Sequence, residues 1–311
     1  MIVKNSMMHI FKDPYILAYL VFYLIVLLLL HSLEGMSILE PLVALLVAGV
    51  GFSTVAWWTT RGTVPFPYLV KQPKSECILL VLCLVVVTLF LTWGLNIVET
   101  AIHTEPLKSL AILAAKLLMF VLLPLLLWRA VWRYPVRDLM NIGPGTRRHL
   151  RIIGWMALVL ILFQIILGRG LSVMRESGLP WWSLVVGAPF AYVWLVLEAG
   201  LVEEFFFRAL IQSRLAALLK SETAGVVLMS ILFGLAHAPG MYLRTSKSLE
   251  ILGPSPSLLA AVGYSILITS VAGFFLGVLW ARTKNLTVVV LVHAAADLVP
   301  SITGIVQAWT F

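Results

Sequence analysis

The sequence predicts an all-α fold, a polytopic transmembrane helical bundle of about nine helices, with roughly eight to ten allowed by uncertain span ends. Composition is the first indication, because 61% of the residues are hydrophobic and only 12% are charged. Soluble domains are about a quarter charged. The mean hydropathy of +1.03 agrees with this. Finally, apolar stretches recur at about 17–25 residues, the length that a helix needs to cross a bilayer.

These apolar stretches follow one another along the whole chain, and Pro and Gly mark most of the connections between them. The predicted spans cover residues 14–33, 38–58, 77–97, 107–131, 151–169, 182–212, 222–240, 258–281 and 286–308. Most of the 22 lysines and arginines fall in alternate connections, on the side that carries the N-terminus. By the positive-inside rule, we expect an integral protein of the bacterial inner membrane with a cytoplasmic N-terminus.

The net charge of +8 comes from these lysines and arginines, which lie mostly in the connections between spans. No polar segment interleaves basic and aromatic residues, so we expect the lipid bilayer as a partner and no nucleic acid.

Motifs divide the chain into two predicted regions. Residues 1–150 hold transmembrane helices without a recognised motif, and residues 151–311 hold a candidate catalytic bundle.

Ionisable side chains are rare deep within the predicted spans, away from the span ends, and each is a functional candidate because a charge at bilayer depth is costly. They are Lys116, Glu198, Glu203, Glu204, His237, His293 and Asp297. Glu204 lies four residues before Arg208 in the string LVEEFFFR, so the two share a helix face and can pair. The same spacing joins His293 to Asp297.

Helix lengths predict that three of these groups meet at one depth. Glu203 and His237 flank the turn near residues 221–223, each roughly 23–27 Å from it at 1.5 Å per residue. His293 follows its own turn more closely, so the levels agree if residues 208–220 extend past the membrane as an amphipathic tail. We therefore expect Glu203, His237 and His293 to converge in the cytoplasmic half of the bilayer.

Two hydrolytic schemes fit these residues. In one, Glu203, His237 and His293 bind Zn²⁺ or another divalent metal, which acidifies a bound water. In the other, a glutamate and a histidine activate water without a metal, and the second histidine with Asp297 stabilises the oxyanion. Both schemes predict water attack on a carbonyl, and hence peptide hydrolysis within a membrane.

Other interpretations stay open at this point. The Glu204–Arg208 pair can be a structural bridge, Lys116 can snorkel or pair, and Glu198 can cap a kink near Gly200. The whole cluster can also serve a non-enzymatic transporter or scaffold, as a relay or a structural core. The sequence has no detectable inverted repeat, which argues against a carrier.

The three motifs Glu203-Glu204-x-x-x-Arg208, Phe233-x-x-x-His237 and His293-x-x-x-Asp297 resemble those of the CPBP family in order and spacing. This family comprises CAAX prenyl endopeptidases and Abi-type bacteriocin-processing intramembrane proteases. The resemblance covers about residues 190–300. HExxH, GxSG and GxGD, the signatures of other intramembrane proteases, are absent from the sequence.

The resemblance implies an intramembrane endopeptidase, of metallo- or glutamate type, that cleaves a membrane-associated peptide or protein near the cytoplasmic leaflet. It implies that Glu203 activates water, that Glu204 and Arg208 support it, and that His237 and His293 are catalytic or bind metal. Asp297 stands where many members have Asn. An ionised Asp cannot donate a hydrogen bond, so its oxyanion role stays open.

Overall fold

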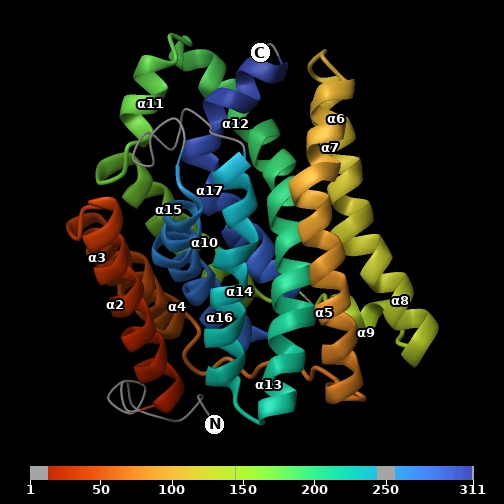
Figure 1. The fold of residues 1–311 in the computed structure, drawn as a ribbon. Helices are drawn as coiled ribbons and strands as arrows, with labels where there is room; N and C mark the ends of the chain where they lie inside the picture. The colour runs from red at the N-terminus through yellow and green to blue at the C-terminus, as the bar shows by residue number, and fades with distance from the viewer. Residues whose placement is uncertain (1–12, 144, 244–255, 310–311) are drawn as a thin grey trace. The chain divides into compact units, whose positions relative to one another are not determined.

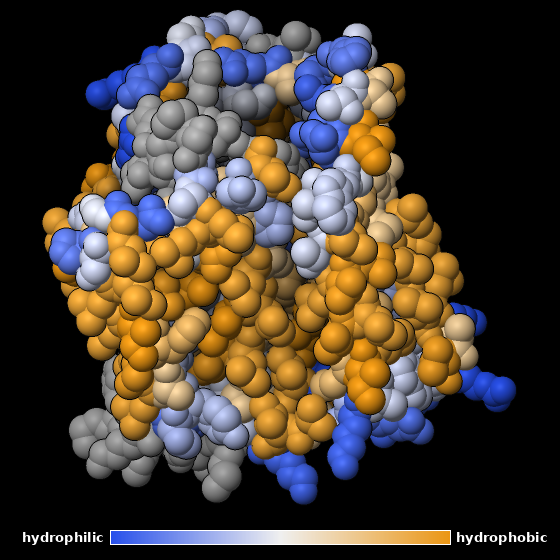
Figure 2. Space-filling view, viewed as in Figure 1, coloured by the Kyte–Doolittle hydropathy of each residue, from blue (hydrophilic) through white to orange (hydrophobic). Residues whose placement is uncertain are grey.

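The computed structural model describes residues 13–143, 145–243 and 256–309. Within these ranges there is no strand, and nine helices are long and apolar enough to cross a membrane. The predicted all-α transmembrane bundle is therefore confirmed. Hydrophobic side chains cover the middle of the helices in the view of Figure 2, and hydrophilic ones gather near their ends. Residues 1–12, which contribute to the predicted orientation, lie outside the described ranges.

Each predicted span overlaps one of these helices. They cover Pro14–Glu34, Leu39–Thr59, Pro73–Ala101, Leu107–Trp132, Arg147–Ile166, Trp181–Leu219, Glu222–Leu243, Leu258–Thr283 and Leu286–Trp309. The sixth helix reaches Leu219, as the predicted tail requires. However, Gln212 and Arg214 in that tail are buried in the protein, so the tail is not amphipathic in the way that we predicted.

The chain forms two compact units. Unit 1 comprises Met1–Trp93 with Leu210–Lys284, and unit 2 comprises Gly94–Ala209 with Asn285–Phe311. The chain passes from one unit to the other inside the third long helix, inside the sixth and between Lys284 and Asn285, and each unit is described by itself. The predicted division at residue 150 concerns motifs and not compactness, and it stays a prediction.

Unit 1 consists of α-helices and short π-helical segments (Figure 1). In chain order they are α2 (Pro14–Glu34), α3 (Leu39–Ala44), η1 (Leu45–Phe52), α4 (Ser53–Thr59), α5 (Pro73–Leu89), α13 (Ser213–Leu219), α14 (Glu222–Leu243), α15 (Leu258–Tyr264), η7 (Ser265–Thr269) and α16 (Ser270–Thr283).

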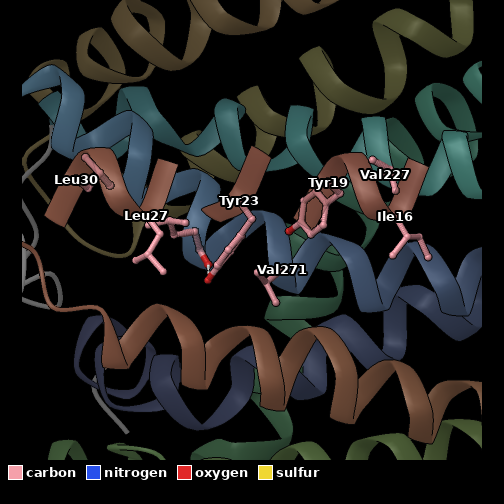
Figure 3. Packing of buried hydrophobic residues seen from close by; sticks show 8 residues of the cluster. Ile16, Tyr19, Tyr23, Leu27, Leu30, Val227 and Val271 are labelled. Carbon is pink, nitrogen blue, oxygen red and sulfur yellow. Dashed lines mark hydrogen bonds between the residues drawn. The ribbon is translucent and has the colours of Figure 1, made fainter. Parts of the chain in front are cut away.

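The core of unit 1 packs one face of α2 against α14, η7 and α16, as Figure 3 shows. Tyr23 lies at its centre, fully buried, and its hydroxyl lies 2.5 Å from the Pro41 carbonyl oxygen and 3.0 Å from that of Leu267. Lipid is as apolar as a leucine side chain, so packing and interhelical hydrogen bonds, not the exclusion of water, hold such helices together.

Glycines allow α14 to approach its neighbours closely in unit 1. A Cβ on Gly234 would lie 2.7 Å from the Ser265 carbonyl oxygen, and one on Gly273 would lie 3.0 Å from the Phe233 ring. Small residues on both helices therefore allow this close packing.

Unit 2 also consists of α-helices and short π-helical segments (Figure 1). Its elements are α6 (Leu95–Ala101), α7 (Leu107–Leu117), η3 (Leu118–Leu122), α8 (Leu123–Trp132), α9 (Val136–Met140), α10 (Arg147–Ile166), α11 (Gly170–Glu176), α12 (Trp181–Leu195), η4 (Val196–Leu201) and α17 (Leu286–Trp309). The segments η2 (Phe90–Gly94) and η5 (Glu204–Gln212) cross the boundary between the units.

Candidate active site

In unit 2, three carboxylates surround the imidazole of His293 on α17. Nδ1 of His293 lies 2.6 Å from Oε1 of Glu204. On the opposite edge of the ring, Nε2 lies 3.2 Å from Oδ2 of Asp297 and 3.9 Å from Oε2 of Glu203. Two carboxylates within hydrogen-bond distance favour a ring that donates from both nitrogens, as the imidazolium does.

Exposure rises across this cluster from one side of the ring to the other. The side chain of Glu204 is fully buried, and that of His293 is 7% exposed. Glu203 is 20% exposed and Asp297 is 38% exposed. Glu203 and Asp297 can therefore reach a substrate, whereas Glu204 can act only through His293.

Arg208 supports Glu204 from within the same helix. Its Nη1 lies 3.1 Å from Oε1 of Glu204, and both side chains are fully buried. The i,i+4 pair predicted from the sequence is thus present. Removing one partner of such a buried pair is strongly destabilising, so Arg208 stabilises the carboxylate of Glu204 that faces His293.

Close packing between the sixth and ninth long helices sets the height of these groups. A Cβ on Gly200 would lie 2.7 Å from the Val290 carbonyl oxygen, so only glycine allows this approach. Nearby, the hydroxyl of Tyr192 donates to the Leu291 carbonyl at 3.0 Å. These two contacts fix the register that places the glutamate pair opposite His293.

The glutamate pair also lies at a change in helix type. Glu203 lies between the π-helical segments η4 and η5, and Glu204 is the first residue of η5. Such π-helical turns occur often at functional sites. The wider turn rotates the residues that follow it. No pattern in the sequence indicates this local change.

The three phenylalanines after the glutamates are packed inside the protein. Phe205, Phe206 and Phe207 are at most 1% exposed, and the Phe206 ring packs edge-on against Phe120 at 5.4 Å between centroids. Their burial keeps them from lining a groove for the substrate, and they instead hold the helix that carries the glutamates.

His237 lies on α14, in unit 1. Its Nδ1 is 2.7 Å from the carbonyl oxygen of Phe233, and the two rings are 4.7 Å apart. Because a carbonyl can only accept, Nδ1 carries a proton, and Nε2 of the neutral ring is then the basic nitrogen. The convergence of His237 with Glu203 and His293 stays a prediction, since these residues belong to unit 2.

A second intramembrane ion pair lies in unit 2. Nζ of Lys116 on α7 pairs with Oε1 of Glu198 on η4, and both side chains are about one-fifth exposed (21% and 22%). Of the two roles that the sequence allowed for Lys116, pairing is therefore the one observed. The partner is 82 residues away, and the sequence held no signal that joins the two.

The described residues contain no group of three or more His, Cys, Asp or Glu side chains arranged to hold a metal ion. In unit 2, both ring nitrogens of His293 face carboxylate oxygens at hydrogen-bond distance. The set predicted for Zn²⁺, Glu203, His237 and His293, is not established, because it includes a residue of unit 1.

Comparison with known families gives a match over somewhat more than a third of the chain. Residues 181–299 match the family model described as type II CAAX prenyl endopeptidase Rce1-like. This range contains all six predicted site residues: Glu203, Glu204, Arg208, His237, His293 and Asp297. Neither curated proteins nor solved structures gave a match.

Proposed function

Because residues 181–299 form an Rce1-like domain, consistent with the CPBP family, and the chain is a bundle of membrane-length helices, we propose that it is an intramembrane endopeptidase of this type in which Glu203 activates water. Family and fold together support the coarser statement, an intramembrane protease. The observation that carries the finer one is His293, held by buried Glu204 on one edge while Glu203 and Asp297 flank the other.

In this proposal Glu203 accepts a proton from water, and the water oxygen attacks the carbonyl carbon of the scissile peptide bond. The carbonyl π electrons move to oxygen, and the Nε2–H of His293 stabilises the oxyanion that forms. Glu203 then gives its proton to the amide nitrogen, the C–N bond breaks, and an acid and an amine leave.

Glu204 and Arg208 are positioning residues in this scheme, since both are fully buried and act through His293. Asp297 orients the same ring from the exposed side. We propose that His237, on α14 in unit 1, is also required for cleavage. The substrate would be a membrane-associated peptide or protein cleaved near the cytoplasmic leaflet.

The test uses the purified full-length protein with a library of quenched fluorescent peptides. We expect cleavage by the wild type, and a fall of about 10²–10⁴-fold for Glu203→Gln, the range for loss of a general base. His237→Ala should also lose activity. Glu176→Gln is the matched control, because this glutamate is exposed and outside the cluster.

Two outcomes would overturn the proposal. Absence of cleavage by the wild type would favour a transporter or a scaffold that uses the same charges as a relay or a structural core. Cleavage that survives in Glu203→Gln would remove this residue from the chemistry. Activity lost with a chelator and restored by Zn²⁺ would favour the metal scheme over the one proposed.

A further inference from the structure

The ends of α4 and α16 pack together in unit 1, and a buried arginine lies where they meet. Arg282, in the last turn of α16, is 4% exposed. Its Nε donates to the Thr60 hydroxyl, and its Nη2 donates to the Thr60 carbonyl oxygen at 3.4 Å. Phe66 N–H donates to the Thr283 carbonyl oxygen at 3.1 Å, which holds the chain after α4 against the end of α16.

A second arginine shares this place. The guanidinium of Arg61 lies over the ring of Trp57, 4.1 Å from its centroid, and that of Arg282 lies 5.8 Å from the same centroid. Within the described part of the chain, no carboxylate forms an ion pair with either arginine. Other buried cations of unit 1 differ, since Arg214 pairs with Glu76 and Lys284 pairs with Glu222.

Two polar atoms here also lack a hydrogen-bond partner among the described residues. They are Nη1 of Arg282 and Oγ1 of Thr63, and both are buried. Thr63 belongs to the same turn, because its N–H donates to the Thr60 carbonyl oxygen at 3.0 Å. Buried donors are nearly always satisfied in native proteins, so such a pair indicates a missing acceptor.

We propose that Arg61, Thr63 and Arg282 bind the phosphate of an anionic lipid headgroup. Guanidinium groups match phosphate oxygens in geometry and charge, and a hydroxyl adds a further donor. The site lies at the ends of two membrane-length helices, next to a tryptophan, as expected at a lipid–water interface. The predicted orientation places both ends on the cytoplasmic side, where anionic lipids attract cations.

A purely structural role explains only part of this arrangement. Arg282 lies at the C-terminus of α4, where a cation is favourable beside the last carbonyls. That accounts for its contacts with Thr60. It accounts neither for a second arginine on the same tryptophan nor for the two donors without an acceptor.

The experiment measures lipid binding, and it is independent of proteolysis. The full-length protein in neutral detergent is melted with increasing phosphatidylglycerol, phosphatidylcholine, glycerol phosphate or inorganic phosphate. We expect phosphatidylglycerol alone to raise the Tm, since a ligand that binds only the folded state stabilises it. Arg61→Gln should weaken this binding about fivefold, as for loss of one cation near an anionic surface.

Thr63→Val separates binding from folding. It removes a hydroxyl without a partner, so the Tm in phosphatidylcholine should stay the same or rise, while the affinity for phosphatidylglycerol falls. Arg148→Gln, an exposed arginine in unit 2, should change neither.

The proposal is overturned if phosphatidylglycerol and phosphatidylcholine shift the Tm equally. It is also overturned if Arg61→Gln and Thr63→Val bind lipid as Arg148→Gln does. If inorganic phosphate raises the Tm as much as phosphatidylglycerol, the site takes a soluble anion and the lipid assignment is wrong.

Discussion

Two fully buried glutamate–arginine pairs lie among the residues that the structure describes, one in each unit. In unit 1, Nε of Arg214 lies 2.9 Å from Oε2 of Glu76. In unit 2, Nη1 of Arg208 lies 3.1 Å from Oε1 of Glu204. The two pairs are alike in burial and distance, so neither property decides which of them belongs to a reactive site.

The partners of each carboxylate make the difference. Oε1 of Glu76 accepts from the backbone N–H groups of Lys71 and Gln72, at 3.1 and 2.8 Å. Arg214 in turn donates to the Tyr68 hydroxyl at 2.6 Å. Burial raises the pKa of that hydroxyl, so it stays neutral beside the pair. The unit 1 pair thus ties a connecting segment to the helices.

Glu204 instead connects the buried ion pair, through His293, to partly exposed side chains. Its Oε1 lies 3.1 Å from Nη1 of Arg208 and 2.6 Å from Nδ1 of His293. Its Oε2 has no hydrogen-bond partner within the described residues. Beyond His293 lie two partly exposed carboxylates, Glu203 and Asp297. A buried ion pair indicates function when it orients a titratable ring whose other edge can reach a substrate.

The largest expected effect comes from neutralising each pair in turn. Glu204→Gln should lower peptide cleavage at least about 100-fold, because His293 loses the anion that orients it. Glu76→Gln should instead destabilise the protein by about 3–5 kcal/mol, the cost of leaving a buried cation unpaired. Cleavage rates per folded molecule and thermal melting would measure the two effects. Equal loss of activity in both variants would show that the two pairs do not differ in their contribution to cleavage.

Replacing both partners of a pair separates its contribution to stability from its contribution to activity. The double variant Glu76→Leu with Arg214→Leu should regain most of the lost stability and keep its activity, since an apolar pair of similar volume avoids the desolvation cost. Glu204→Leu with Arg208→Leu should regain stability and remain inactive. An active Glu204→Leu, Arg208→Leu variant would show that the unit 2 pair is structural as well.

The next effect concerns helix packing in unit 2. Gly200→Ala should lower activity on the order of tenfold to 100-fold, because a displacement of about 1 Å can misplace reacting groups by that much. Gly154→Ala is the control, since a Cβ there meets nothing within 4 Å. It should leave activity unchanged and raise stability by up to about 1 kcal/mol. If Gly200→Ala keeps full activity, the Val290 contact does not set the height of the glutamates.

A smaller effect is expected at the exposed edge of the ring. Asp297→Asn should change kcat/KM by less than about tenfold, because the amide oxygen can still accept from Nε2 of His293. Asp297→Leu should be clearly worse, since it removes the acceptor. A 100-fold loss in the Asn variant would show that the charge of Asp297, and not its oxygen, is required.

The smallest effect belongs to the Lys116–Glu198 pair, which is partly exposed. A double-mutant cycle with Lys116→Met and Glu198→Gln should give a coupling of about 0.2–1 kcal/mol in stability. Activity should fall no more than stability requires. A large loss of activity in either single variant would place this pair in the substrate site.

Local spacing explains how much of the site could be predicted. Glu204 with Arg208 and His293 with Asp297 are each four residues apart on a helix, and both contacts are present. Helix lengths, with a tail over residues 208–220, predicted a common level for Glu203, His237 and His293. The contact between Glu203 and His293 agrees with the part that lies in unit 2. Helical rise converts sequence distance into depth, which is why these predictions hold.

Contacts between distant residues could not be predicted in the same way. Glu76 and Arg214 are 138 residues apart, and either could have paired with many other groups. The π-helical turns beside Glu203 leave no mark in the hydrophobic pattern, and the burial of Phe205 to Phe207 depends on helices packed around them. Apolar residues in a membrane protein face lipid or protein alike, so composition does not distinguish the two.

The most direct measurement of the central claim is a single turnover of peptide cleavage in water enriched in ¹⁸O. If Glu203 activates water that attacks the peptide carbonyl itself, the new carboxylate should carry one ¹⁸O atom already in the first turnover. A first-turnover product without ¹⁸O would mean that an enzyme oxygen attacks the carbonyl, and the proposed role of Glu203 would be wrong.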